Sequence, residues 1–138
     1  MTENKELMEL LKRARTCRYE IDAQLRHIER LHDVIDRTRD LTRVKIYTDR
    51  LAGLEVKINA SINRAADAES EVQHLLDELN GSEKAVLYRY YILGEEWSDI
   101  AKNIYFSERS IYNIRKQALR KLSRIYEKEK GNEIRHNN

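Results

Sequence analysis

Apolar residues recur at alternating spacings of three and four along the first quarter of the chain, which is typical of a helix with one continuous buried seam. The pattern begins at Leu7 and is interrupted once, at Gln24. A seam of about four heptads predicts a long amphipathic helix that packs lengthwise against another helix. Its members are Leu7, Leu10, Ala14, Cys17, Ile21, Ile28, Leu31 and Ile35.

A second seam with the same alternation begins at Leu51. Between the two seams the register is lost over residues 39–49, so we expect a connection there, with Thr48 or Asp49 as the N-cap of the second helix. Two helices of similar length joined by a short connection fold back as an antiparallel hairpin. We therefore assign residues 1–80 to a coiled-coil helical hairpin. The second seam comprises Leu51, Leu54, Ile58, Ser61, Ala65, Ala68, Val72, Leu75 and Leu79.

Further apolar residues widen both seams, as Leu11, Leu25 and Ile62 illustrate. A hairpin alone buries little surface, so we expect an additional partner: a second copy, the C-terminal part of the chain, or a protein such as RNA polymerase. A four-helix homodimer is the simplest solution. Gln24 would lie near Ser61, where a polar layer can fix the register. The residues expected at the oligomer interface are Leu7, Leu10, Leu11, Ile21, Ile28, Leu31, Leu54, Ile58 and Val72.

Turn and cap signals divide residues 81–128 into three further helices. Asn80-Gly81 ends the hairpin, because both residue types tolerate the left-handed conformation of a helix C-cap. Ser82 is expected to cap a helix over residues 83–93, which Gly94 terminates. Tyr90 and Tyr91 of this helix, and Trp97 after it, are expected to pack in the core or the turn, whereas Tyr88 is expected to face outward.

The last two predicted helices are a short one over residues 98–104 and a long one that Ser107 caps. Between them, Phe106 is expected to fill the turn. We extend the long helix to about residue 128, and we expect the polar tail, residues 129–138, to be disordered. The sequence therefore predicts an all-α protein, with a hairpin followed by a compact helical module.

Positive charge gathers in one segment of a chain whose formal net charge is only +2. Residues 1–80 carry 14 Lys and Arg against 16 Asp and Glu, whereas residues 81–138 carry 12 against 8. Between residues 107 and 126 there are six basic residues and one acidic residue. This local excess of basic residues favours a polyanion as the partner. A membrane is less favoured, because no broad apolar face is expected beside the basic residues.

Other classes of protein find little support in the sequence. The segment MTENKELMEL is charged from its third residue, unlike a signal peptide, and no apolar run reaches the length of a membrane span; we expect a cytoplasmic protein. Cys17 is the only cysteine, and the histidines show no ligand spacing, so we expect no metal and no cofactor. Without a glycine loop for phosphate or a nucleophile motif, we expect neither an enzyme nor a small-molecule substrate.

A short helix, a tight turn and a longer basic helix form the pattern of a helix-turn-helix. Ala101 is small enough to let the second helix cross closely. On the outer face of the long helix, we expect Arg109, Tyr112, Asn113 and Lys116 to read bases in the major groove. The expected phosphate contacts, which supply salt-dependent affinity, come from Lys102, Ser107, Arg115 and Arg120.

The segment SEKAVLYRYYILGEEWSDIAKNIYFSERSIYNIRKQALRKL, residues 82–122, resembles region 4 of sigma-70-type factors. The resemblance rests on the Ile100-Ala101 pair, the serine cap at Ser107 and the Ala-Leu-Arg-Lys-Leu ending, residues 118–122. It implies a helix-turn-helix that binds duplex DNA. Tyr105 stands where the family usually has glycine, and the base-reading positions also differ, so the target sequence is not carried over. No equivalent of the promoter-melting region precedes the segment.

The layout of hairpin plus basic module is similar to small phage and prophage transcriptional regulators of the ArpU/RinA type. That resemblance implies a sequence-specific activator of late phage genes that acts with host RNA polymerase. Two alternatives remain open. One is a phage DNA-packaging protein resembling a small terminase, which would form a larger ring. The other is an adaptor that binds polymerase or a sigma factor without reading DNA.

Overall fold

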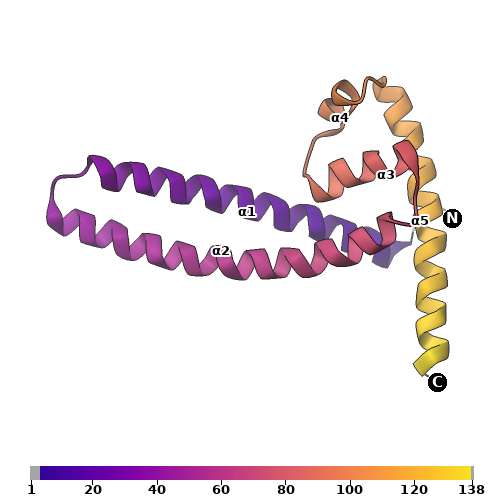
Figure 1. Ribbon diagram of the computed structural model, residues 1–138, viewed down its shortest axis with the longest axis horizontal. Coiled ribbons are helices and arrows are strands. Elements are labelled where there is room, and N and C mark those ends of the chain that lie inside the picture. Colours follow the sequence, from indigo (N-terminus) through magenta and orange to yellow (C-terminus); the bar gives the residue numbers. More distant parts are fainter. Residues whose placement is uncertain (1–3, 138) are drawn as a thin grey trace. The chain divides into compact units, whose positions relative to one another are not determined.

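The computed structural model describes the backbone of residues 4–137 and the side chains of residues 4–132. Within that range the chain is helical and contains no β-strand. The prediction of an all-α protein is therefore confirmed (Figure 1). The elements are α1 (Lys5–Arg37), α2 (Leu41–Leu76), α3 (Gly81–Leu87), the π-helical turn η1 (Tyr88–Ile92), α4 (Trp97–Asn103) and α5 (Glu108–Asn137).

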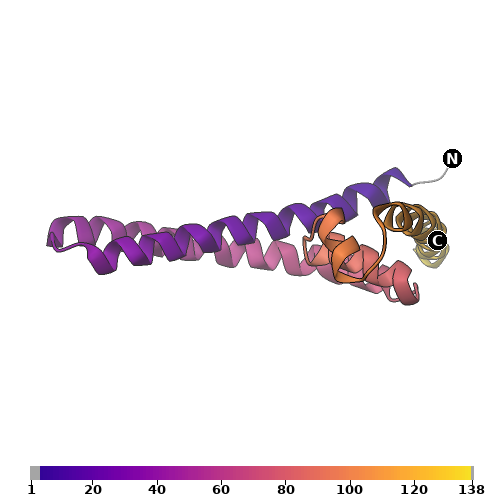
Figure 2. The same cartoon turned by 90° about the horizontal axis from the view of Figure 1, so that it is seen from above.

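The two longest N-terminal helices, α1 and α2, pack as an antiparallel hairpin, and Figure 2 shows them side by side from a second direction. Most residues of both predicted seams are buried. The connection is shorter than expected, and the predicted caps at Thr48 and Asp49 are wrong. Asp40 caps α2, because its Oδ1 accepts a hydrogen bond from the backbone N–H of Thr42 at 2.9 Å. Residues 41–49 are helical because the seam extends further than expected: Val44 and Tyr47 continue the alternating spacing back from Leu51, and both are half-buried.

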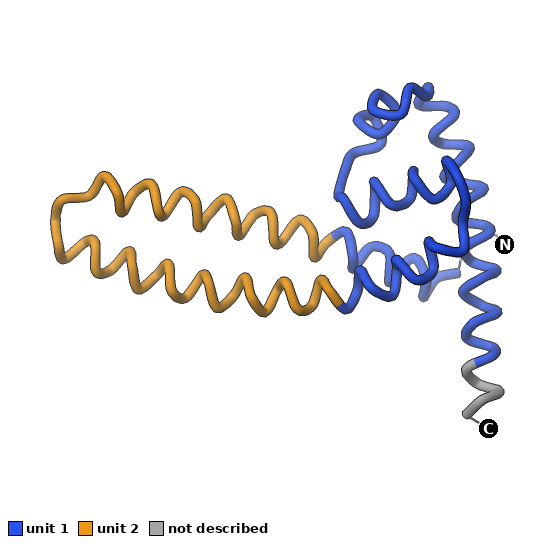
Figure 3. The backbone as a smooth tube through the Cα atoms, in the orientation of Figure 1, with its two compact units in different colours: residues 1–15, 67–138 blue, residues 16–66 orange. Residues whose placement is uncertain are grey.

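The chain divides into two compact units, and the boundary between them crosses both helices of the hairpin (Figure 3). Unit 1 contains residues 1–15 and 67–138, and unit 2 contains residues 16–66. The expected boundary at residue 80 therefore differs from the observed division. The first turns of α1 and the last turns of α2 belong with the C-terminal helices.

The core of unit 1 joins residues from both ends of the sequence. Leu7 and Leu11 of α1, which are 0% exposed, share one cluster with Leu119 of α5. Where α1 begins and α2 ends, the widened apolar stripe of the hairpin therefore packs against the C-terminal part of the same chain. Four residues predicted for the oligomer interface are consequently buried inside unit 1 and offer almost no surface to a second copy: Leu7, Leu10, Leu11 and Val72.

Unit 2 has a smaller core between α1 and α2. Cys17 and Ile21 cluster with Ile58 and Ala65, as the seams predict, and Ile28 packs against them. The widening residues Leu25 and Ile62 stay 44% and 45% exposed. An apolar surface therefore remains on this unit.

Gln24 interrupts the apolar seam in unit 2, and its side-chain Oε1 is buried without a hydrogen-bond partner among the described residues. A buried acceptor without a donor costs about 1–3 kcal/mol. We expect Gln24→Leu to raise the free energy of unfolding by about 1 kcal/mol, measured by urea denaturation. Gln117→Leu, at an exposed position of α5, is the control and should change stability little. A loss of stability in Gln24→Leu would show that the amide is satisfied.

The predicted helix over residues 83–93 is divided in the structure into α3 and η1. Asn80 is its N-cap, without a side-chain hydrogen bond, so the predicted cap at Ser82 is wrong. Gly94, with φ of 77°, follows η1, as expected of a glycine that ends a helix.

The C-terminal helix is longer than predicted. Instead of ending near residue 128 before a disordered tail, α5 continues to Asn137. Residues 127–130 alternate glutamate and lysine, both strong helix formers, and no proline interrupts them. Only Asn138 of the predicted tail lies outside the described residues.

Candidate nucleic-acid interface

The end of α4 is a Schellman motif, in which a left-handed residue reverses the chain. The N–H of Phe106 donates to the carbonyl oxygen of Ala101 at 3.0 Å, and the N–H of Tyr105 donates to that of Lys102 at 3.4 Å. Tyr105 has a φ of 58°, and it occupies the position where such motifs usually carry glycine. These two hydrogen bonds fix the conformation of the turn between α4 and α5.

Ser107 caps α5 as predicted. Its Oγ accepts a hydrogen bond from the N–H of Ser110, three residues later, at 3.1 Å. The hydroxyl also donates to the Oγ of Ser110 at 2.9 Å. Both contacts are local, and the serine side chain remains exposed at the start of α5.

The inner faces of α4 and α5 meet in a small core. Ile100 and Ala101 of α4 and Ile111 of α5 are buried in one cluster with Val86 of α3. The small side chain of Ala101 suits a close helix crossing, as the sequence predicted. Phe106 is 41% exposed, so it fills the turn less completely than expected.

The four predicted base-reading residues, Arg109, Tyr112, Asn113 and Lys116, are all exposed. Spacings of four and three place Arg109, Asn113 and Lys116 on one side of α5. From Arg109 to Lys116 the helix rises about 10 Å, which is comparable with the roughly 12 Å width of a DNA major groove. Of the predicted phosphate-binding residues, Lys102, Ser107 and Arg120 are likewise exposed.

Arg115, also predicted to bind phosphate, has a different environment. It is half-buried, and its guanidinium lies 4.9 Å from the centre of the Trp97 ring. Trp97 stacks on Tyr90 with 3.8 Å between ring centres and 8° between planes. The guanidinium of Arg15, from α1, lies 3.7 Å from the Tyr90 ring. These four residues, which we call the aromatic column, connect α1 through η1 to α4 and α5.

Arg15 is also held by polar contacts, although its side chain is charged and only 8% of the residue is exposed. Its Nη1 donates to the carbonyl oxygens of Tyr90 and of Glu95, the latter at 3.0 Å. Its Nη2 pairs with Oε1 of Glu96 at 3.0 Å. Arg15 therefore fixes the loop that precedes α4 from the side of α1.

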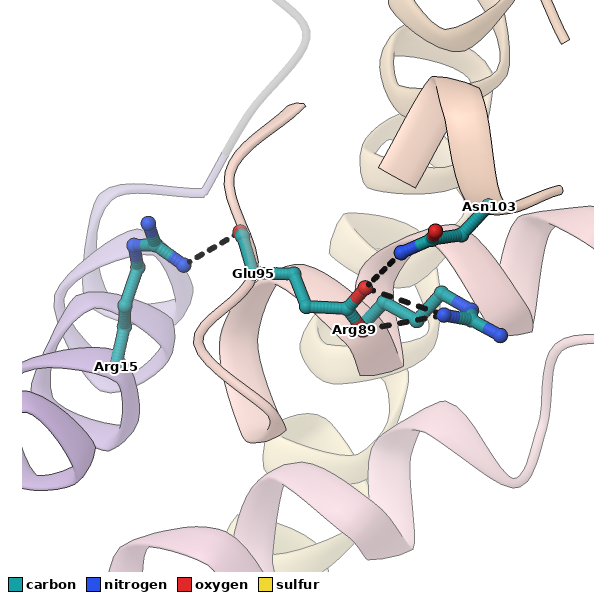
Figure 4. A network of polar contacts seen from close by, with 4 residues as sticks. All are labelled: Arg15, Arg89, Glu95 and Asn103. Carbon is teal, nitrogen blue, oxygen red and sulfur yellow. Dashed lines mark hydrogen bonds and ion pairs between the residues drawn. The ribbon is translucent and has the colours of Figure 1, made fainter. Parts of the chain in front are cut away.

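Glu95 extends this network to α4 (Figure 4). Its carboxylate accepts two hydrogen bonds from Nη1 of Arg89, at 3.1 and 3.2 Å. The same carboxylate accepts a third from Nδ2 of Asn103, at 3.1 Å. The loop before α4 is thus bonded to α1, to η1 and to the end of α4 itself.

Sequence reasoning missed the role of Arg15. The available signal was its spacing, since Arg15 lies four residues after Leu11 and so continues the widened apolar stripe. A guanidinium in such a stripe must find several acceptors if it is to be buried. The acceptors lie 75 to 81 residues away, so local spacing does not reveal them.

One basic residue of α5, Lys121, is paired within the protein. Its Nζ lies 2.6 Å from Oε1 of Glu83. Burial raises the pKa of Tyr126 further along the helix, because it disfavours the phenolate. A hydrogen bond from Gln73, followed by one from Lys84, lowers the pKa of Asp77 at the end of α2. The ion pair with Glu83 sets Lys121 apart from the exposed basic residues of α5.

The described residues contain no group of three or more His, Cys, Asp or Glu side chains placed to hold a metal ion. No helix in that part of the chain is long and apolar enough to span a membrane. Comparisons of the chain with protein-family models, with curated proteins and with solved structures gave no match.

Proposed function

We propose that the protein is a sequence-specific duplex-DNA-binding transcriptional regulator of phage or prophage type. The observation that carries the proposal is the exposed side of α5. A long helix, capped at Ser107 and held by its inner face, presents Arg109, Asn113 and Lys116 together to solvent. In this proposal α4 and α5 form a helix-turn-helix, with α5 as the recognition helix.

Each exposed side chain has a stated part in the proposal. Arg109 donates two hydrogen bonds to the O6 and N7 of guanine, and Asn113 pairs with adenine. Tyr112 lies against a thymine methyl, and Lys116 reaches a further base. Lys102, Ser107 and Arg120 contact phosphates, which fix the orientation of the module on the duplex. Arg115 contributes chiefly by its contact with Trp97 and supports α4.

The hairpin supplies association in this proposal. Residues of unit 2 retain exposed apolar side chains, including Leu25, Val34 and Ile62. A second copy covering them would give a dimer that binds two half-sites about one helical turn apart. The resemblance to sigma-70 region 4 and to ArpU/RinA-type regulators supports activation together with RNA polymerase.

The test is selection of binding sequences from a random pool of duplex DNA with the full-length protein, followed by affinity measurements on the selected site. We expect a defined motif. The double variant Arg109→Ala with Asn113→Ala should weaken binding to that motif by about 100-fold. Each of the two side chains loses a contact to a base, and such a contact is worth about 1–3 kcal/mol. The control is Arg26→Ala with Asn63→Ala, two exposed residues of the hairpin. It also removes one guanidinium and one amide, and it should leave the affinity for DNA unchanged.

Other results identify the alternatives. Salt-dependent binding without a motif, together with a ring-sized assembly, would favour the packaging protein. Absence of duplex binding at low salt would contradict the proposal and favour the polymerase-binding adaptor.

A further inference from the structure

Tyr105 is the one non-glycine residue with positive φ in the part of the chain that the structure describes. Its φ of 58° places a bulky L-residue in the left-handed region, which typically costs about 1–2 kcal/mol. Glycine at this position of a Schellman motif carries no such cost. The strain therefore comes from the identity of the side chain, since the turn itself is of a common type.

Packing within the protein does not offset this cost. The Tyr105 residue is 93% exposed, so its ring buries almost no surface. Strained residues cluster at functional sites and ligand contacts, so this exposed, strained side chain is a candidate for a contact outside its own protein.

The surroundings of Tyr105 indicate what that contact is. Tyr105 stands three residues after Lys102, two before Ser107 and four before Arg109, and all three of these residues are exposed. The two basic residues and the serine hydroxyl thus lie close to Tyr105 in sequence. Glu108 is the one acidic residue between Tyr105 and Arg109. This chemistry suits a phosphate backbone better than an apolar protein surface.

We propose that Tyr105 is a DNA-backbone contact at the edge of the groove that α5 enters. The phenol O–H donates a hydrogen bond to a phosphate oxygen, and the ring lies against the adjoining deoxyribose. This inference rests on the proposed function and adds a residue of the turn to it. In this proposal the side chain provides a DNA contact at the expense of stability.

The experiment compares Tyr105→Gly, Tyr105→Asn and Tyr105→Phe in the full-length protein, by thermal unfolding and by affinity for the selected duplex. Glycine and asparagine both accept the left-handed conformation. We expect both to raise Tm and both to bind DNA about fivefold to tenfold more weakly. Tyr105→Phe should leave Tm unchanged and lose part of the affinity, because only the hydroxyl is removed.

Salt dependence separates this contact from the charged ones. A neutral phenol displaces no counterion, so Tyr105→Gly should leave the slope of log affinity against log salt unchanged. Lys102→Ala should reduce that slope by about 0.9. Tyr105→Gly would overturn the inference if it bound DNA as tightly as the wild type, or if it lowered Tm.

Failure of this inference and failure of the proposed function give different results. If Arg109→Ala with Asn113→Ala abolishes binding while Tyr105→Gly retains it, only the role of Tyr105 is overturned. If the wild-type protein binds no duplex, both proposals fail together.

Discussion

Replacing Leu11 with alanine is expected to lower the free energy of unfolding by about 3–4 kcal/mol, the usual cost of a cavity at a completely buried leucine. Leu11 is 0% exposed and lies in the cluster that joins α1 and α2 to α3, η1 and α5. For a chain of this size, the loss corresponds to a fall in Tm of about 10 °C. Thermal and urea denaturation measure it.

Leu41→Ala is the matched control, because Leu41 begins α2 and is 83% exposed. It should change stability by less than about 0.5 kcal/mol. The effect of Leu11→Ala should also be independent of protein concentration, since the contacts lie within one chain. A destabilisation that disappears at high protein concentration would instead place Leu11 in an oligomer interface, as the sequence pattern had suggested.

Replacing Arg15 with alanine is expected to cost about 3 kcal/mol. The substitution removes hydrogen bonds from a charged donor to two carbonyl oxygens and to a carboxylate, together with the stacking on Tyr90. Arg15→Lys should recover only part of the loss, because an ammonium lacks the planar fork and stacks less well.

The Arg15 variants have a second readout in Trp97, the single tryptophan of the chain. Its ring belongs to the aromatic column, so Arg15→Ala should change tryptophan emission under native conditions. Arg13→Ala, at an exposed position of the same helix, should change neither stability nor emission. Unaltered emission together with full stability in Arg15→Ala would show that the column does not depend on Arg15.

Local patterns in the sequence were sufficient for several features of this protein. The heptad spacing from Leu7 and from Leu51 predicts the two hairpin helices, because helical period and burial are both set by neighbours a few residues apart. Ser107 predicts the start of α5 for the same reason, since its cap contact reaches only three residues. The exposure of Arg109, Asn113 and Lys116 follows from the inward stripe that begins at Ile111.

Some local signals were ambiguous, and the structure resolved them differently. Asp40 and Asp49 are both acceptable caps, and Asp40 accepts the bond because α2 begins at Leu41, with Val44 and Tyr47 continuing the seam back from Leu51. Similarly, the polar tail was compatible with disorder or with a solvated helix. Its Glu and Lys content and the absence of proline favour the helix that the structure contains.

Tertiary structure alone decided which surfaces meet. The sequence shows that Leu11 widens an apolar stripe, but α5 residues such as Leu119, more than a hundred positions away, share its cluster. It shows an arginine at residue 15, but the carbonyl oxygens that make its burial possible belong to a distant loop. Periodicity reports which face of a helix is apolar and carries no information on the identity of the partner. That identity depends on the folded arrangement, because many apolar faces are interchangeable until side-chain shape and buried hydrogen bonds select among them.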